Sequence, residues 1–129
     1  MDIEVLIPKD GPHFDLPLSP GIKYNDLIFV SGQVPYDQQG NLVGRGDIKK
    51  QTEQTLKNVE VVLRAGGATM GDILKVNVYM KDGSQFPEMN EVYREFFKER
   101  FPARATVQTG LIARDDILIE IEALARVPK

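Results

Sequence analysis

The spacing of apolar residues along this chain changes between periods of about two and about 3.6 residues, which are typical of strands and helices. Residues 27–34 form an apolar, β-branched run that predicts a buried strand, and residues 75–80 alternate in a way that predicts another. Two more strands are predicted at about residues 103–109 and 117–127. The first 24 residues are rich in Pro and Gly, which indicates loop with a short strand at residues 3–7.

Two segments between these strands have helical spacing. The first follows Asp47, which is placed as an N-cap, and ends at a Gly-Gly pair. The second follows Asp82, carries an apolar stripe and ends before Pro102. The resulting order ββαβαββ contains strand–helix–strand steps, and such crossovers are right-handed. We therefore expect an α+β fold with one mixed sheet, both helices on one face of it, and a single domain over residues 1–129.

The sheet face away from the helices carries charged residues, and their arrangement depends on the last two strands. If residues 110–116 connect these strands as a hairpin, Arg104 lies opposite Glu122 and Thr106 opposite Glu120, all on that face. Two interpretations stay open at this point. The charges form a cross-strand ion pair on a solvated sheet, worth ~0–1 kcal/mol. Alternatively, the Arg binds a carboxylate ligand through its planar fork while a nearby Glu positions water.

Ser31 and Gly32 interrupt the first buried strand. A Gly inside a strand marks a β-bulge or a place where another group approaches the backbone closely. The chain has a single His, His13, which lies in a polar loop, so Ser31 is not expected to act as a nucleophile. We expect it to make hydrogen bonds at the bulge instead.

Composition narrows the chemistry further. The absence of Cys excludes disulfides, thiol nucleophiles and zinc–thiolate sites, and the single His disfavours a His-rich metal site. The net charge of −3 and the pI of about 5.2 argue against general affinity for nucleic acid or anionic membranes. No signal-like segment or membrane-length apolar run is visible, so a cytoplasmic location is expected.

Three stretches of the chain form an ordered set of motifs. The first is Phe-Val-Ser-Gly-Gln-Val-Pro at residues 29–35. The second runs from Asn58 through the Gly pair to Val-Tyr at residues 78–79. The third combines Phe-Pro-Ala-Arg at residues 101–104 with Ile-Glu-Ile-Glu-Ala-Leu-Ala at residues 119–125. Together they span most of the chain, and in this order and spacing they resemble the RidA (YjgF) family of reactive intermediate deaminases.

This resemblance implies a chorismate-mutase-like fold and a homotrimer with ligand sites in the clefts between subunits. In relatives with deaminase activity, the Arg of the Pro-Ala-Arg motif binds the substrate carboxylate, and the first Glu of the Glu-Ile-Glu motif holds the hydrolytic water. These roles carry over to Arg104 and Glu120. The Ser-Gly segment that lines the family's pocket is Ser31-Gly32 here, and the family's Asn at the start of the second helix is Asn90.

Two positions of the binding set depart from the family's pattern. Leu18 stands where the archetypal deaminases have a Tyr in the loop before the first signature strand. Thr106 stands where they often have a Cys. Replacing Tyr removes a phenolic hydrogen-bonding group, whereas Thr keeps the size and a polar atom of Cys but not its thiol chemistry.

The implied activity is hydrolysis of 2-imino or enamine acids, such as 2-iminopropanoate or 2-iminobutanoate, to 2-keto acids and ammonia. The substrate is a small carboxylate, and the reaction requires no cofactor and no metal. Leu18 keeps open an alternative, a non-catalytic ligand-binding or chaperone-like protein. A third possibility is an endoribonuclease, an activity attributed to some relatives. The acidic pI and the lack of a visible basic stripe with stacking aromatic residues weigh against it.

Overall fold

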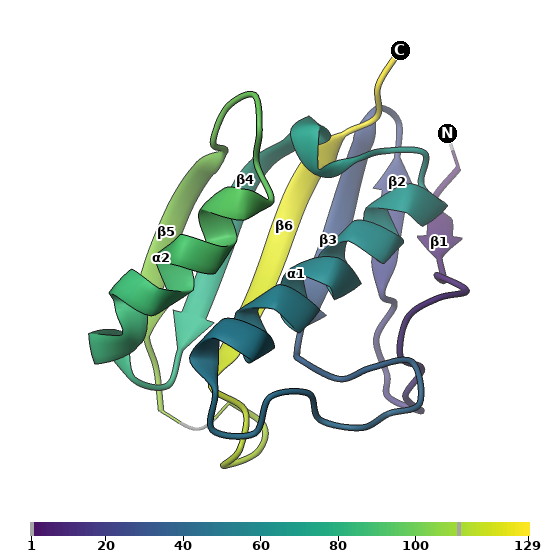
Figure 1. Ribbon diagram of the computed structural model, residues 1–129. Coiled ribbons are helices and arrows are strands. Elements are labelled where there is room, and N and C mark those ends of the chain that lie inside the picture. Colours follow the sequence, from purple (N-terminus) through teal and green to yellow (C-terminus); the bar gives the residue numbers. More distant parts are fainter. Residues whose placement is uncertain (1, 111) are drawn as a thin grey trace.

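One mixed six-stranded sheet forms the frame of the molecule in the computed structural model, which describes residues 2–110 and 112–129 (Figure 1). The strands lie in the order β1-β2-β3-β6-β4-β5. β4 and β5 pair in parallel, and the other neighbours pair antiparallel. The bounds are β1 Glu4–Leu6, β2 Gly21–Tyr24, β3 Leu27–Gln33, β4 Ile73–Met80, β5 Ala103–Gln108 and β6 Ile119–Arg126.

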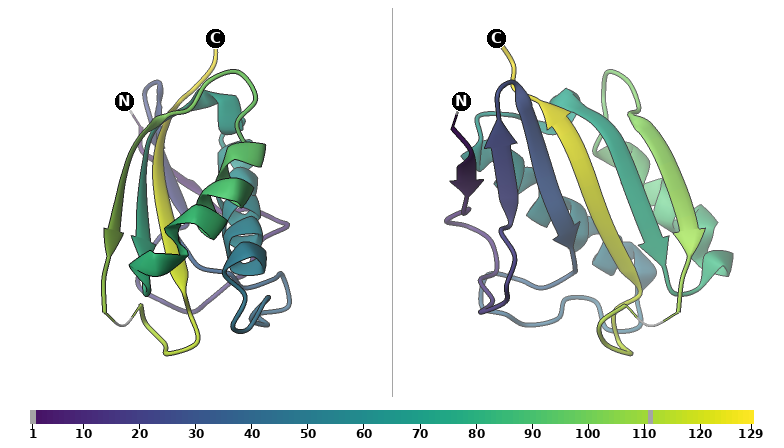
Figure 2. Two further views of the ribbon diagram at one scale, coloured as in Figure 1. Left: turned by 60° about the vertical axis from the view of Figure 1, so that its left-hand side comes forward. Right: turned by 180° about the vertical axis from the view of Figure 1, so that it is seen from behind.

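Two helices, α1 (Ile48–Ala65) and α2 (Phe86–Glu95), cover the same face of this sheet, which confirms the predicted fold class (Figure 2, left). α1 begins at the predicted N-cap, where Asp47 accepts a hydrogen bond from the backbone N–H of Lys50 at 3.1 Å. The opposite face of the sheet has no helix over it (Figure 2, right), and we refer to it as the open face. Among the described residues, no helix is long and apolar enough to span a membrane.

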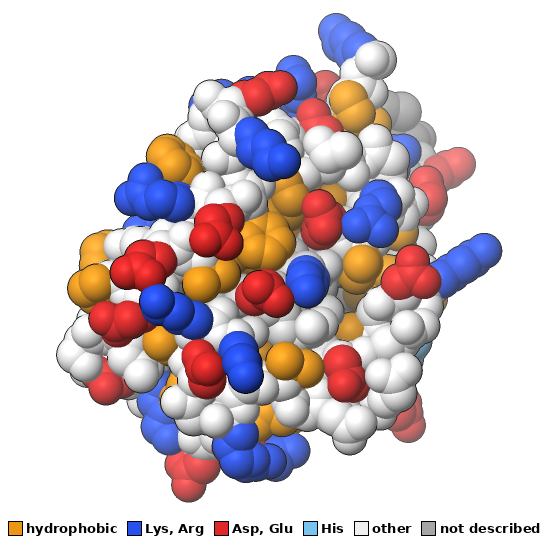
Figure 3. Space-filling view, viewed as in Figure 1, with side chains coloured by type: hydrophobic (Ala, Val, Ile, Leu, Met, Phe, Trp, Pro, Cys, Tyr) orange, Lys and Arg blue, Asp and Glu red, His pale blue; other side chains and the backbone are white. Residues whose placement is uncertain are grey.

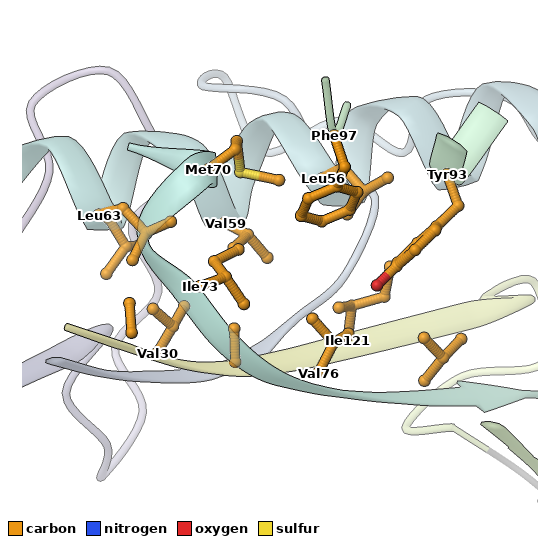
Figure 4. Close-up of a cluster of buried hydrophobic side chains, with 14 of the residues drawn as sticks. Val30, Leu56, Val59, Leu63, Met70, Ile73, Val76, Tyr93, Phe97 and Ile121 are labelled. Carbon is orange, nitrogen blue, oxygen red and sulfur yellow. The ribbon is translucent and has the colours of Figure 1, made fainter. Parts of the chain in front are cut away.

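The main core lies between the sheet and the helices (Figure 4). α1 contributes one apolar stripe, in which Leu56, Val59 and Leu63 are at most 1% exposed. β4 and β6 contribute alternate residues, such as Val76 and Ile121. Each fully buried side chain of this size stabilises the fold by roughly 1.5–3 kcal/mol. This packing fixes the two central strands that carry polar residues on the open face.

The last two strands do not form the predicted hairpin. β4 lies between them, because the chain crosses over through α2 and places β5 parallel to β4. Arg104 is in register with Val76, and Thr106 with Val78, and both valines face the core. Neighbours in register point to the same side of a sheet, so Arg104 and Thr106 point to the helix side and not to the open face.

The prediction for the last strand is confirmed, whereas the prediction for the N-terminal segment is only partly correct. On β6, Glu120 and Glu122 alternate with the buried Ile119 and Ile121, as predicted. The short strand predicted at residues 3–7 is β1, and residues 7–20 form loop as expected. The prediction of loop is wrong only for β2, which pairs with both β1 and β3. Four residues are too few to show a clear period, and the surrounding Pro and Gly residues mask it.

Candidate functional site

A β-bulge in β3 builds the first half of the candidate site. Between residues 30 and 33, β3 holds two residues where β6 holds one, which confirms the bulge predicted at Ser31 and Gly32. The Ser31 N–H donates a hydrogen bond to the carbonyl of Pro20 at 2.9 Å, and the Ser31 hydroxyl donates to the carbonyl of Ser19. The bulge therefore fixes the loop that carries Leu18, whose side chain is 59% exposed.

Glu120 lies directly against this bulge. A Cβ at position 32 would be only 2.1 Å from Oε2 of Glu120, so the glycine makes room for the carboxylate. Burial raises the pKa of Glu120, and the negative charge of Glu122 raises this pKa further. A carboxyl group whose pKa is raised exchanges protons closer to neutral pH, as a general base must.

Glu122 has different surroundings, although it lies two residues away on the same face. It accepts hydrogen bonds from Nδ2 of Asn77 at 2.8 Å and from the hydroxyl of Tyr79 at 3.1 Å. Burial and the Glu122 carboxylate both raise the pKa of Tyr79, which keeps the phenol protonated as a donor. Glu122 is thus held in place by β4, whereas no side-chain donor among the described residues bonds to Glu120.

The two carboxylates line a hollow on the open face, which we call the Glu120 hollow. Its volume is about 270 Å³, and its other lining residues are Tyr79, Thr109, Ile112 and Ala113. These residues come from β4 and from the segment that follows β5. A small ligand in this hollow meets the Glu120 carboxylate.

Arg104 lies in a second hollow of about 250 Å³, the Arg104 hollow, lined by Asn90, Tyr93, Arg94, Phe101, Pro102 and Arg104. Its Cζ atom is 4.6 Å from the ring centroid of Tyr93 and 5.5 Å from that of Phe86. Cation–π contact with these two rings of α2 holds the guanidinium. Within the described ranges Arg104 has no ion-pair partner, so its donors remain open to an anion.

Two buried hydroxyl groups on the same side lack hydrogen-bond partners. They are Oγ1 of Thr106, on the Arg104 side of β5, and the Tyr93 hydroxyl, which points toward the sheet in Figure 4. Burial raises the pKa of Tyr93, and the Arg104 charge opposes that effect. A buried polar group without a partner costs about 1–3 kcal/mol. Both groups therefore lower the stability of the single chain.

The structure divides the predicted site residues into two groups. The group at the bulge comprises Leu18, Ser31, Gly32 and Glu120. The group on the helix side comprises Asn90, Arg104 and Thr106. The predicted position of Arg104 opposite Glu122 is wrong, because β4 separates their strands and the side chains leave opposite faces. The interpretation as a cross-strand ion pair is wrong for the same reason.

Three further residues belong to these groups although the sequence predicted no role for them: Asn77, Tyr79 and Tyr93. Asn77 and Tyr79 make up the polar side of the alternation at residues 75–80, and that alternation was the available signal. Tyr93 falls in the apolar stripe of α2, which indicates core packing alone. Its contact with Arg104 depends on where β5 lies, which the stripe does not specify.

Sequence comparisons match nearly the whole chain. The model of the family described as Endoribonuclease L-PSP matches residues 10–127. A RutC family protein of Pyrococcus horikoshii is 43% identical over 122 residues, which cover 95% of this chain and 96% of the relative. The 3-aminoacrylate deaminase RutC of Acinetobacter baylyi is 34% identical over 127 residues, which cover 98% of this chain and 100% of the relative.

Solved structures agree with these matches. Yersinia pestis YyfA, of the Rid protein family, has a TM-score of 0.92 and 35% identity, and the match covers 98% of this chain and 100% of that one. E. coli TdcF with bound serine has a TM-score of 0.89 and 32% identity, with 98% and 99% coverage. Sequence and fold therefore lead to one conclusion: the chain belongs to the Endoribonuclease L-PSP family, which is the YjgF/RidA family.

Proposed function

We propose that the protein hydrolyses 2-imino or enamine acids, such as 2-iminopropanoate or 2-iminobutanoate, to 2-keto acids and ammonia. The observation that carries this proposal is the division of the site into two open halves. The Arg104 hollow offers a cation for a carboxylate, and the Glu120 hollow offers a base for water. Because each half has the group that the other lacks, two copies of the chain that bring them together complete one site.

A homotrimer is the assembly we propose for this pairing. The open face exposes apolar side chains among polar ones, with Phe29 and Val107 each 47% exposed. β5, which carries Arg104, is an edge strand. Three copies in a closed ring bury such a face and set each edge beside a neighbour. Each of the three clefts then receives Arg104 from one copy and Glu120 from the next.

The chemistry follows from the groups in such a cleft. Arg104 binds the substrate carboxylate through two parallel hydrogen bonds and thereby orients the C=N carbon. Glu120 takes a proton from water while the water oxygen bonds to the carbon of the protonated imine, and the electron pair of the C=N bond moves to nitrogen, which gives a carbinolamine. The Glu120 carboxyl then gives this proton to nitrogen. The C–N bond breaks and ammonia leaves, while the carbinolamine hydroxyl returns a proton to Glu120 as the C=O bond forms. This hydrolysis already proceeds in water, so orientation and one base, worth about 10²–10⁴-fold, suffice.

Two relatives support a small amino-substituted acid as the ligand. One is named for 3-aminoacrylate, a three-carbon carboxylate with an enamine nitrogen. The TdcF structure holds serine, another three-carbon amino-substituted acid. A carboxylate of this size fits the hollows of this chain and the charge of Arg104.

Ammonia release from an imine generated in place by an amino-acid oxidase tests the proposal. We expect the wild type to exceed the uncatalysed rate. Arg104→Ala and Arg104→Lys should each lose roughly 2–5 kcal/mol of transition-state binding, because Lys cannot reproduce the planar fork. Arg64→Ala is the matched control, since Arg64 is exposed and pairs with Glu60 on α1. A wild type without acceleration would overturn the proposal, and near-normal turnover by Arg104→Ala would remove the anchor role.

The two alternatives give different results in the same assays. A non-catalytic ligand-binding protein, which Leu18 favours, binds small carboxylates but releases no ammonia above background. An endoribonuclease needs a continuous basic surface for RNA. The helix side instead has acidic and basic side chains intermingled (Figure 3), and the net charge is −3. RNA cleavage that survives Arg104→Ala and extensive purification would favour the nuclease.

A further inference from the structure

A second arginine shares the Arg104 hollow. Arg94 lies on α2 one turn after Asn90, so their side chains leave the same face of the helix. Both residues line the hollow together with Arg104. None of the six lining residues is acidic, so this small volume of about 250 Å³ holds two positive charges and no negative one.

Both guanidinium groups rest on aromatic rings and not on carboxylates. Cζ of Arg94 lies 5.7 Å from the ring centroid of Phe101, and Arg104 is held by rings of α2. Neither arginine has an ion-pair partner in the part of the chain that the structure describes. Glu91, an acid of the same helix, pairs with Lys49 at 2.7 Å instead. A stacked guanidinium keeps its fork of donors open to a planar anion.

The reaction proposed above uses only one of these two cations. Arg104 is sufficient for a substrate with a single carboxylate, and such a ligand leaves Arg94 unpaired beside it. Two like charges in one hollow repel each other, and a ligand with two negative charges offsets that repulsion more fully than a ligand with one. Asn90 also lines this hollow, and its side-chain amide is a group with both hydrogen-bond donors and an acceptor.

We infer that Arg94 binds a second carboxylate, so that the preferred substrates are 2-imino dicarboxylic acids of about the size of 2-iminosuccinate. This inference rests on the proposed function, because it assigns the substrate class of the same site. Hydrolysis follows the same steps: water adds to the C=N carbon, ammonia leaves, and the product is oxaloacetate. No further reactant is needed.

Binding of two keto acids isolates the contribution of the second carboxylate. Oxaloacetate and pyruvate differ by one carboxylate group, and calorimetry on the trimer gives their Kd values. We expect oxaloacetate to bind the wild type about tenfold more tightly, ~1.4 kcal/mol. Arg94→Gln should bring the ratio of the two Kd values to about one. Arg64→Gln removes an exposed arginine of α1, far from the hollow in sequence, and should leave the ratio unchanged.

Turnover gives a second measure that misfolding does not mimic. The ratio of kcat/KM for 2-iminosuccinate over 2-iminopropanoate, both generated in place from amino acids, should fall about tenfold in Arg94→Gln. A general loss of structure lowers both values and leaves the ratio unmoved. Equal Kd values in the wild type, or ratios that Arg94→Gln does not change, overturn the inference while imine hydrolysis stands. A Kd ratio that depends on Arg94 without turnover of either imine supports the dicarboxylate site and overturns the proposed function.

Discussion

Glu120 and Glu122 show how far the surroundings of a residue decide its chemistry. The two carboxylates lie two positions apart on one face of β6. Glu122 is held by two donors of β4, whereas Glu120 lies against Gly32, where burial raises its pKa. Glu120 is therefore suited to proton exchange and Glu122 to bracing the site. The sequence motif contains both residues but does not show which has donors beside it.

Substitution of each Glu by Gln separates these roles. Glu120→Gln should lower kcat by about 10²-fold or more with KM little changed, because it removes the base from the chemical step. Glu122→Gln should keep more of kcat and shift the acidic limb of the pH–kcat profile to lower pH. The direction follows because Glu120 acts when ionised, and loss of a neighbouring negative charge lowers its pKa. Steady-state kinetics across the acidic range measures both effects.

Thermal unfolding provides the second readout for Glu122. When Glu122 loses its charge, the hydrogen bonds from Asn77 and Tyr79 weaken. Glu122→Gln should therefore lower the free energy of unfolding by about 1 kcal/mol and the Tm by roughly 4 °C. Loss of kcat confined to Glu122→Gln, with Glu120→Gln near normal, would exchange the two assignments.

At the scale of elements, the pattern of apolar residues predicted where the strands lie more reliably than it predicted which strands pair. β4 and β6 are central strands with one buried face, so alternation alone fixes which residues point to the core. On β5, Ala105 and Val107 are apolar yet exposed, because parallel pairing with β4 sets the faces. The assumed hairpin placed Ala105 and Val107 on the core face instead. A short sequence pattern cannot reveal that another strand lies between two predicted strands.

The β3 bulge was predictable because a glycine interrupts a buried strand. Substitution of this glycine tests whether the bulge positions Glu120 for catalysis. Gly32→Ala places a Cβ where Oε2 of Glu120 lies, at a separation of 2.1 Å. The carboxylate must move away, so we expect kcat to fall at least about tenfold, since misplacement of a catalytic group by about 1 Å costs up to 10²-fold. Because the end of the Glu side chain is flexible, the fold should persist, as circular dichroism can verify.

Gly71→Ala is the matched control for this variant. A Cβ at Gly71 meets only Oγ1 of Thr69, at an ordinary contact distance of 3.7 Å. It should leave turnover unchanged. Equal kcat values for Gly32→Ala and the wild type would show that the position of Glu120 against the bulge is unimportant for catalysis.

At the scale of the whole molecule, the open sheet face is the feature that a single chain leaves unexplained. Figure 2 shows one face covered by helices and the other bare. Motifs allow Arg104 and Glu120 to be proposed as site residues, but not their relation, because the contact proposed between them joins two copies. Patterns along one chain report contacts within it, and here those contacts keep the two residues apart.

The molecular mass in solution tests the proposed trimer directly. Sedimentation equilibrium should give about three times the chain mass of 14.5 kDa. A monomer at micromolar concentration would contradict both the trimer and the shared clefts.

Mixing two inactive variants tests whether each cleft takes its two key residues from different chains. When Arg104→Ala and Glu120→Gln subunits assemble at random in equal amounts, about one cleft in four receives an intact Arg104 from one copy and an intact Glu120 from its neighbour. The mixture should therefore recover about a quarter of wild-type activity after subunit exchange. If both residues of a site came from one chain, every site would carry a substitution, and the mixture would stay inactive. The double variant mixed with wild type is the control, because shared clefts leave about a quarter of sites intact and unshared ones about half.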